Sequence, residues 1–338
     1  MKISFLAPHL RVSGGLRIIL GYASLLAARG NEVTVYVQSV NPFRRTIANF
    51  FHLGYPKWIA NFHAQIVRVP SFTPETVKGD VLVATTYKTA LAIADFPKSA
   101  GHQFYLLQHD EGLYHGDRAL VDRAYRLPQQ KIVVATWLKH LLQEKYGQDS
   151  ALLLNPIDRE LFHPVAQDRH DGICILLLDH TYEWKGTKEG VATVLELKQK
   201  YSGIRLIGFG ARKIDSEHEF DEYYYDLPQE KLSWLYSNCD IFLCPSWDEG
   251  FGLPSLEAMA CKTAVVTYDN GGSRDFAFHE KTALVVPRRD MKRLALELER
   301  MVKDHALRER IAQGGHEFVV TMSTWEEQTK KLEAILQR

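Results

Sequence analysis

Two glutamates flank a glycine-rich turn in the second half of the chain. Glu249 precedes Gly250 and Gly252, and Glu257 follows Pro254, so that the two carboxylates are eight residues apart. Pro254 suits the first position of a helix, which would place Glu257 in the first helical turn. Glycines allow close approach of a ligand, and helix-start amides attract an anion such as a diphosphate. We expect both carboxylates to face one pocket and to accept hydrogen bonds from sugar hydroxyls; the alternative is a helix start with two surface acids.

A second group of candidate residues lies in the first half of the chain. His109, Asp110 and Glu111 follow the apolar run of residues 103–107, which predicts a strand. A histidine beside acids at a strand end is a candidate for reaction chemistry, although a structural role is equally plausible. Asp110 or Glu111 would orient an acceptor hydroxyl or act as a base, and the sequence does not rank them.

The elements that position these residues alternate between strands and helices. In the first half we expect strands at residues 2–7, 32–38, 65–69, 80–85, 103–107, 131–135 and 151–154, and helices at 16–28, 86–94 and 137–145. In the second half we expect strands at residues 173–178, 204–208, 240–244, 263–267 and 283–286, and helices at 187–201, 229–237, 254–260, 291–303, 306–319 and 324–336. Such alternation predicts mainly parallel sheets with both faces covered.

The chain length of 338 residues favours two domains. A polar stretch at residues 163–172 indicates a linker. We therefore predict an α/β protein with two Rossmann-like domains, residues 1–163 and residues 164–320. Residues 321–338 would form a helix that packs back toward the first domain. Ligands bind beyond the carboxyl ends of parallel strands, so we expect the site in the cleft between the domains.

The composition and charge of the chain limit the classes of function and partner that it can have. Lys plus Arg and Asp plus Glu both number 41, so no overall field draws the chain to nucleic acid. The four cysteines form no Cys-x-x-Cys pair and are expected to be buried free thiols. The sequence lacks the signs of a signal peptide and of a membrane span, so we expect a cytoplasmic or membrane-peripheral protein. Metal-binding motifs are also absent, so we expect neither a metal nor another cofactor.

The Glu-x7-Glu segment resembles that of the retaining glycosyltransferases of the GT-B fold, glycosyltransferase family 4 or glycosyl transferases group 1. The resemblance implies sugar transfer from a nucleotide-diphosphate sugar to a hydroxyl acceptor, often in cell-envelope or polysaccharide biosynthesis. It also implies that residues 1–163 lie on the acceptor side and that residues 164–320 bind the nucleotide sugar. It implies that Glu249 contacts the donor sugar, that Glu257 binds the ribose, and that His109 approaches the donor sugar. Donor-binding positions in the turn are Gly250, Phe251, Gly252 and Leu253.

Further segments resemble the same family in the same order. Asn155-Pro-Ile-Asp158 is similar to its interdomain segment, although Pro156 stands where glycine is usual. Lys185 matches the cation that neutralises the donor pyrophosphate, whereas His180 stands closest to the place of the expected arginine. The resemblance adds donor-binding residues at the N-terminal loop, at a strand end and near the nucleobase: Gly14, Gly15, Gly208 and Tyr225.

Other functions stay open at this stage. A GT-B sugar-nucleotide epimerase, a phosphorylase and a catalytically silent nucleotide-sugar-binding protein fit the same motifs. The stretch from Phe43 to Trp58 combines cations with aromatic residues, as membrane-surface segments do. A partly buried loop and helix packed on the sheet is the alternative there.

Overall fold

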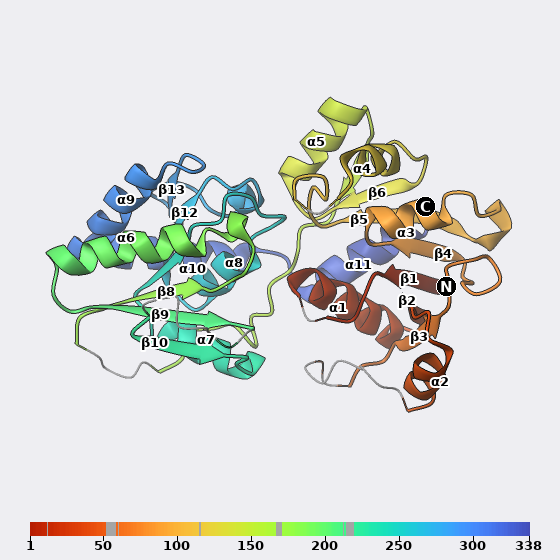
Figure 1. Cartoon of the computed structure of the whole chain (residues 1–338), viewed down its shortest axis with the longest axis horizontal. Coiled ribbons are helices and arrows are strands. Elements are labelled where there is room, and N and C mark those ends of the chain that lie inside the picture. The colour runs from red at the N-terminus through yellow and green to blue at the C-terminus, as the bar shows by residue number, and fades with distance from the viewer. Residues whose placement is uncertain are drawn as a thin grey trace. The chain divides into compact units, whose positions relative to one another are not determined.

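The computed structural model describes residues 1–11, 13–51, 59, 61–114, 116–166, 171–211, 213 and 220–338. The chain folds as two compact units, coloured by position along the chain in Figure 1. Unit 1 comprises Met1–Asn155 and Trp325–Arg338, and unit 2 comprises Pro156–Thr324. The boundary at Asn155 precedes the polar stretch expected as a linker, of which residues 167–170 lie outside the described residues.

Unit 1 is built on one parallel sheet with the strand order β3-β2-β1-β4-β5-β6-β7. Its strands are β1 (Lys2–Ala7), β2 (Glu32–Gln38), β3 (Gln65–Val69), β4 (Val81–Ala84), β5 (His102–Leu107), β6 (Gln130–Val133) and β7 (Ser150–Leu152). The central strand β1 is apolar and buried, as expected for a strand covered on both faces. The strand order reverses between the neighbours β1 and β4. The carboxyl ends of these two strands are therefore where a ligand is expected to bind.

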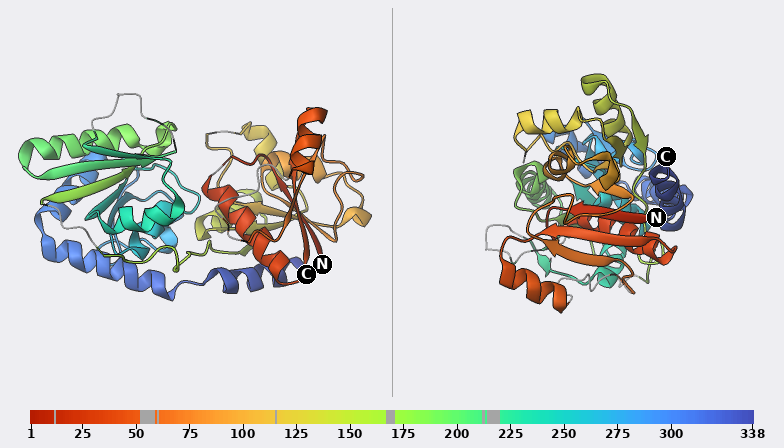
Figure 2. Two further views of the ribbon diagram at one scale, coloured as in Figure 1. Left: turned by 90° about the horizontal axis from the view of Figure 1, so that it is seen from below. Right: turned by 90° about the vertical axis from the view of Figure 1, so that its right-hand side faces the viewer.

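Helices lie on both faces of this sheet (Figures 1 and 2). They are α1 (Gly14–Ala28), α2 (Pro42–Phe50), α3 (Tyr87–Ile93), η1 (Lys98–Ala100), α4 (Arg118–Tyr125), α5 (Thr136–Tyr146) and α11 (Trp325–Leu336). The C-terminal helix α11 packs on α1, where the rings of Tyr22 and Trp325 meet edge to face at 5.2 Å. Gly21 makes this approach possible, because a Cβ there would lie 2.5 Å from the Trp325 ring.

Unit 2 repeats the design with the strand order β10-β9-β8-β11-β12-β13, again entirely parallel. Its strands are β8 (Ile173–Leu178), β9 (Ile204–Gly210), β10 (Glu222–Tyr225), β11 (Ile241–Cys244), β12 (Ala264–Tyr268) and β13 (Leu284–Val286). This is the Rossmann strand order, with its reversal between β8 and β11.

The helices of unit 2 are η2 (Glu183–Lys185), α6 (Thr187–Lys200), α7 (Gln229–Ser237), α8 (Leu253–Ala260), η3 (Gly272–Asp275), α9 (Met291–Lys303) and α10 (His305–Thr321). Helices α6 and α9 pack together, as do α7 and α8. A core of buried aliphatic side chains from β8, β11 and β12 joins the sheet to α6, α9 and α10. Two α/β units with parallel sheets confirm the predicted fold class.

Helix α4, strand β10 and the short helices η1, η2 and η3 were not predicted, and helix α2 was expected only within the alternative of a partly buried loop and helix. Helices α2 and α4 are short and rich in polar residues, and each has an N-cap side chain, Asn41 and Asp117, that accepts a backbone N–H. Strand β10 lies before α7, in a segment where no strand was predicted, and it pairs with β9. Its consecutive tyrosines do not show the polar and apolar alternation of a half-buried strand.

The four cysteines are buried free thiols, as predicted. Within the described parts of the chain, no helix is both long and apolar enough to cross a bilayer.

Candidate functional site

The strand-order reversal of unit 2 brings two loops together at the carboxyl ends of β8 and β11. The loop after β8 leads through η2 into α6, and the loop after β11 leads into α8. A crevice forms at the carboxyl ends of two neighbouring parallel strands when the connections after them lead to opposite faces of the sheet. The candidate residues Lys185 and Glu249 come one from each loop.

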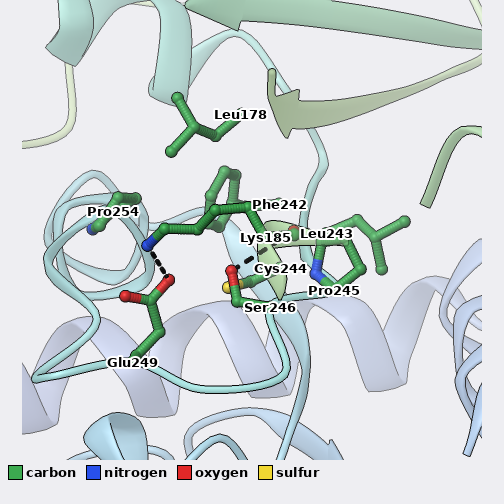
Figure 3. Close-up of a pocket in the computed structure, with 9 residues that line it drawn as sticks. All are labelled: Leu178, Lys185, Phe242, Leu243, Cys244, Pro245, Ser246, Glu249 and Pro254. Carbon is green, nitrogen blue, oxygen red and sulfur yellow. Dashed lines mark hydrogen bonds and ion pairs between the residues drawn. The ribbon is translucent and has the colours of Figure 1, made fainter. Parts of the chain in front are cut away.

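Lys185 and Glu249 form an ion pair across this crevice. Lys185 Nζ lies 2.6 Å from Glu249 Oε1, and the two side chains are 19% and 11% exposed. Figure 3 shows them pointing toward each other in a pocket lined by Leu178, Lys185, Phe242, Leu243, Cys244, Pro245, Ser246, Glu249 and Pro254. A cation and a carboxylate in an otherwise largely apolar pocket can bind a phosphate and hydroxyl groups side by side.

The backbone fixes the position of Lys185. Gly186 has a φ of 66°, and a Cβ there would lie 2.1 Å from the carbonyl oxygen of Pro245. Only glycine therefore lets the two loops approach so closely. The N–H of Trp247 donates to the carbonyl oxygen of Trp184 at 2.7 Å and ties the loops together one residue before Lys185.

The backbone of Glu249 is held by a third loop, which the sequence did not single out. Its N–H donates to the carbonyl oxygen of Asn270 at 2.9 Å, and Glu249 forms a parallel bridge with Gly271. A Cβ at Gly272 would lie 2.7 Å from the Glu249 carbonyl oxygen. The pair Gly271-Gly272, which follows strand β12 after Asp269 and Asn270, is a local signal that would have indicated this loop.

The glycine turn leads into α8 as predicted, with one shift of register. Gly252 has a φ of 92° and precedes the helix, which begins at Leu253, so Pro254 takes the second position. Glu257 consequently lies in the second helical turn rather than the first. Phe251 is buried and packs on the ring of Phe276 at 5.5 Å, which anchors the turn.

The Glu257 side chain is buried, and its carboxylate has a partner outside the Lys185–Glu249 ion pair. Its Oε2 accepts a hydrogen bond from the hydroxyl of Tyr236 in α7 at 3.1 Å. Among the described residues that line the pocket of Figure 3, Glu249 is present and Glu257 is not. The structure therefore does not bring both carboxylates to that one pocket, and Tyr236 is a partner that the sequence did not indicate.

His180 stands at one end of a run of aromatic rings in the loop after β8. Its ring lies 4.5 Å from that of Tyr182, which stacks on Trp184 at 4.4 Å. His180 Nδ1 accepts the backbone N–H of Tyr182 at 3.1 Å. This bond leaves the proton of a neutral imidazole on Nε2, so the ring presents an N–H donor rather than the guanidinium that the resemblance suggested.

The remaining donor candidates of unit 2 lie near the ends of β9 and β10. A Cβ at Gly208 would lie 2.7 Å from the ring of Phe220 and 2.8 Å from that of Tyr223. Aromatic side chains of the protein therefore fill the space beside this glycine. Tyr225 is exposed at the end of β10, next to Asp226, whose φ is 47°.

In unit 1, the start of α1 meets the loop after β5. Gly14 and Gly15 are the first residues of α1, and the side chain of Ser13 accepts the N–H of Leu16 as the N-cap. The side-chain amide of Gln108 donates to the carbonyl oxygen of Gly15 at 3.1 Å. This contact places the residue before His109 against the glycine pair.

His109 is partly buried, with its ring 6.3 Å from that of Trp137 in an edge-to-face arrangement. Asp110 is buried and accepts bonds from Arg118 Nη1 at 3.2 Å and from the hydroxyl of Tyr125 at 3.2 Å. The same Tyr125 hydroxyl accepts the N–H of Glu111 at 3.0 Å. An internal network thus fixes the backbone on both sides of Asp110.

The Glu111 carboxylate caps helix α3. Both of its oxygens accept the N–H of Tyr87, the first residue of α3, at 3.0 Å, and Oε1 accepts the hydroxyl of Tyr105 at 2.7 Å. Burial raises the pKa of the Glu111 carboxyl to about 7, with a smaller contribution from the charge of Asp110; the two hydrogen bonds oppose the rise. Both acids therefore have internal partners in unit 1.

Known proteins resemble parts of this sequence. Residues 174–318 match the family model for glycosyl transferases group 1. O-antigen biosynthesis protein RfbC of Myxococcus xanthus is 26% identical over 268 residues, which cover 75% of this chain and 20% of that protein. Capsular polysaccharide biosynthesis glycosyltransferase CapM of Staphylococcus aureus is 28% identical over 185 residues, 52% of this chain and 47% of that one. The chain thus spans less than half the length of these relatives.

Solved structures resemble the whole chain. Sucrose-phosphate synthase of Thermosynechococcus elongatus has a TM-score of 0.80 at 17% identity and covers 99% of this chain, with 98% of its own chain matched. HepE of Anabaena, in complex with UDP and glucose, has a TM-score of 0.77 at 17% identity, with 100% and 99% covered. The chain therefore has the two-domain GT-B fold, and its residues 174–318 are similar to the glycosyl transferases group 1 family.

Proposed function

We propose that this chain is a glycosyltransferase that moves a sugar from a nucleotide-diphosphate sugar to a hydroxyl acceptor with retention of configuration and without a metal ion. The Lys185–Glu249 ion pair carries the proposal, because it joins a phosphate-binding cation and a hydroxyl-binding carboxylate at the strand-order reversal of unit 2. The match of residues 174–318 to the group 1 family supports the same assignment.

The proposed roles follow from the chemistry of each side chain. Lys185 binds the donor diphosphate as a point charge and stabilises the charge that develops on the leaving phosphate. Glu249 exchanges its bond to Lys185 for bonds from hydroxyls of the donor sugar, and Glu257 accepts the ribose hydroxyls. His180 donates Nε2–H to a phosphate oxygen, and the turn of Gly250 to Leu253 lies against the diphosphate.

Retention is proposed through displacement on one face of the sugar. The bond between the anomeric carbon and the phosphate oxygen breaks, and the bond to the acceptor oxygen forms on the same face. The acceptor proton passes to the departing phosphate oxygen, so the products are the glycoside and the nucleoside diphosphate.

Unit 1 contributes His109 toward the donor sugar in this proposal. Asp110 and Glu111 stay predicted acceptor-side residues, and their internal hydrogen bonds favour a role in holding the His109 loop. Peripheral membrane contact through the region of residues 43–58 is a separate proposal that rests on helix α2; residues 52–58 lie outside the described residues.

Nucleotide-sugar screening tests the function. Thermal shifts with UDP-, GDP- and ADP-sugars identify the donor, since a specific ligand raises the melting temperature by mass action. UDP-glucose is a suitable first donor, because HepE is described in complex with it. The identified donor is then incubated with simple glycosides and with saccharide acceptors, with and without EDTA, and nucleoside diphosphate release is followed. Proton NMR of the product reports the anomeric configuration.

The proposal predicts that EDTA does not change the rate of nucleoside diphosphate release and that the product has retained configuration. Glu249→Gln should release nucleoside diphosphate at least a hundredfold more slowly than the wild type. Glu309→Gln, at an exposed position of α10, is the matched control and keeps the full rate. A product of inverted configuration would overturn the proposed retention, and loss of activity in EDTA would overturn the proposed independence from metal ions. Interconversion of the free nucleotide sugar without transfer would overturn the transferase assignment itself.

A further inference from the structure

Two consecutive arginines lie in the loop between β13 and α9. Arg288 Nε donates to the carbonyl oxygen of Trp247 at 3.0 Å, and the Arg288 guanidinium forms an ion pair with the Asp248 carboxylate. Both acceptors lie in the loop after β11, and Glu249 is the next residue of that loop. In the sheet, β12 separates β13 from β11. Arg288 therefore reaches across one strand to hold the two residues that precede Glu249.

Arg289 packs on the same segment. Its guanidinium carbon lies 3.9 Å from the centre of the Trp247 ring, which is a cation–π contact, and Trp247 belongs to the buried core of unit 2. The N–H of Trp247 also donates to the carbonyl oxygen of Trp184, directly before Lys185. Trp247 is thus held at its ring and its carbonyl oxygen by the two arginines, and at its N–H by the loop of Lys185.

The backbone conformation of Arg289 is unfavourable for an arginine. Its φ is 61°, and it lies in a turn that the N–H of Asp290 closes by donating to the carbonyl oxygen of Pro287 at 3.0 Å. Glycine and asparagine are favoured at such positions of positive φ. Strained residues persist where the surrounding contacts determine their conformation, and they concentrate at functional sites. At Arg289 the contact that accompanies the strain is the one with Trp247, two residues before Glu249.

The exposure of Arg288 favours a positioning role over a purely stabilising one. Its side chain is 48% exposed, and such an ion pair contributes little to the free energy of unfolding. A guanidinium that bonds a carbonyl oxygen and a carboxylate together nevertheless fixes the geometry of both acceptors. Asn270 accepts the N–H of Glu249 itself. Glu249 is therefore fixed by Asn270 at its own backbone and by Arg288 through the residues before it.

We infer that Arg288 is a positioning residue for sugar transfer, which sets the Glu249 carboxylate against Lys185. Arg289 keeps Trp247 in place for this contact. The inference rests on the proposed function and adds residues that need touch neither the donor nor the acceptor. A misplacement of about 1 Å in a group that acts on the substrate can cost about a hundredfold in rate. Loss of Arg288 should therefore act on turnover through Glu249, rather than on the binding of the diphosphate by Lys185.

The kinetics of donor turnover test this inference. Both kcat and nucleoside diphosphate affinity are measured for Arg288→Met, Arg288→Lys and Arg289→Gly, and Arg288→Met is also made in the Glu249→Gln background. The matched control is Arg293→Met, which removes an exposed arginine whose Nε lies 3.5 Å from Asp290 Oδ2. The melting temperatures of all variants report whether the fold is kept.

Arg288→Met should lower kcat about tenfold. It should change the diphosphate affinity less than about twofold, because Lys185 lies on another loop. Arg288→Lys should recover part of the rate, since an ammonium lacks the fork of donors of a guanidinium. In the Glu249→Gln background, Arg288→Met should slow turnover less than about twofold, because it acts through that carboxylate. Arg293→Met should keep the full rate.

Arg289→Gly tests the inference without removing Arg288, and so decides it if Arg288→Met does not fold. Glycine relieves the positive φ, so the melting temperature should stay unchanged or rise while kcat falls about threefold. Beside an active wild type, full turnover by Arg288→Met or Arg289→Gly, or an equal loss from Arg288→Met in both backgrounds, would overturn this inference alone. Absence of sugar transfer by the wild type would overturn the proposed function and this inference with it.

Discussion

Lys185 Nζ lies 2.6 Å from Glu249 Oε1, so the carboxylate proposed to bind sugar neutralises the cation proposed to bind phosphate. The two residues are 64 positions apart in the chain and meet because β8 and β11 are neighbours in the sheet. A donor that binds both groups must replace this single bond with bonds to each.

The ion pair should contribute to stability. Removal of one partner leaves the other charge in a largely enclosed site, so Lys185→Met and Glu249→Gln should each lower the free energy of unfolding. We expect a coupling energy of about 1–2 kcal/mol between the two substitutions in a double-mutant cycle. Urea unfolding of the single and double variants measures it. Strict additivity would show that the pair contributes no coupling energy.

The Glu257–Tyr236 contact should support nucleotide binding. Glu257→Ala removes the proposed ribose acceptor and should weaken nucleoside diphosphate binding about tenfold. Tyr236→Phe keeps the ring but removes the hydroxyl that donates to Glu257, so it should weaken binding less, by about threefold. Calorimetric titration measures both. Equal binding by Glu257→Ala and the wild type would refute the assigned role.

Glu111 should make the stability of unit 1 depend on pH. Its folded-state pKa of about 7 lies above its ordinary value of 4.5, so between these pH values the folded state holds a proton that the unfolded state has lost. Stability from this group is therefore complete below pH 4.5 and falls as pH rises to about 7, by up to about 3 kcal/mol. Glu111→Gln does not titrate. Its stability relative to the wild type should rise by that amount between pH 4.5 and 7.5, and parallel pH profiles in urea unfolding would contradict the prediction.

Gly21 should be required for the packing of α11 on α1. An alanine Cβ would lie 2.5 Å from the Trp325 ring, so Gly21→Ala should cost about 1–3 kcal/mol through overpacking. In a Trp325→Ala background the same substitution meets no ring and should cost under about 0.5 kcal/mol. Urea unfolding of the four proteins gives both values. An equal cost in both backgrounds would show that the ring does not cause it.

Local patterns predicted the fold well. Strands β1, β2, β3 and β8 have the predicted bounds, because short apolar runs between turn residues are a local signal. The glycine turn before α8 and the position of Glu249 at a strand end were predicted for the same reason. For the segment of helix α2 the sequence left open a membrane-surface segment and a partly buried loop and helix, and the structure has a helix of which only Ala48 is buried.

Contacts between residues that are far apart along the chain could not be predicted from local sequence patterns. The bond from Tyr236 to Glu257 depends on the packing of α7 on α8, and the support of Glu249 by Asn270 depends on the order of β11 and β12. The cap of α3 by Glu111 likewise depends on the neighbouring positions of β4 and β5. Residue types indicated the candidate site residues, whereas the tertiary structure determined their hydrogen-bond partners.

Nucleoside diphosphate titration of Lys185→Met and Glu249→Gln tests the central claim most directly. Both variants break the same ion pair, and Lys292→Met on α9 is an exposed control. If Lys185 binds the diphosphate, Lys185→Met should bind UDP, or the diphosphate of the donor found by screening, at least tenfold more weakly. Glu249→Gln should bind it as tightly as the wild type or more tightly, because Lys185 no longer has to leave a carboxylate. Equal weakening by both substitutions, or no change in either, would contradict the account.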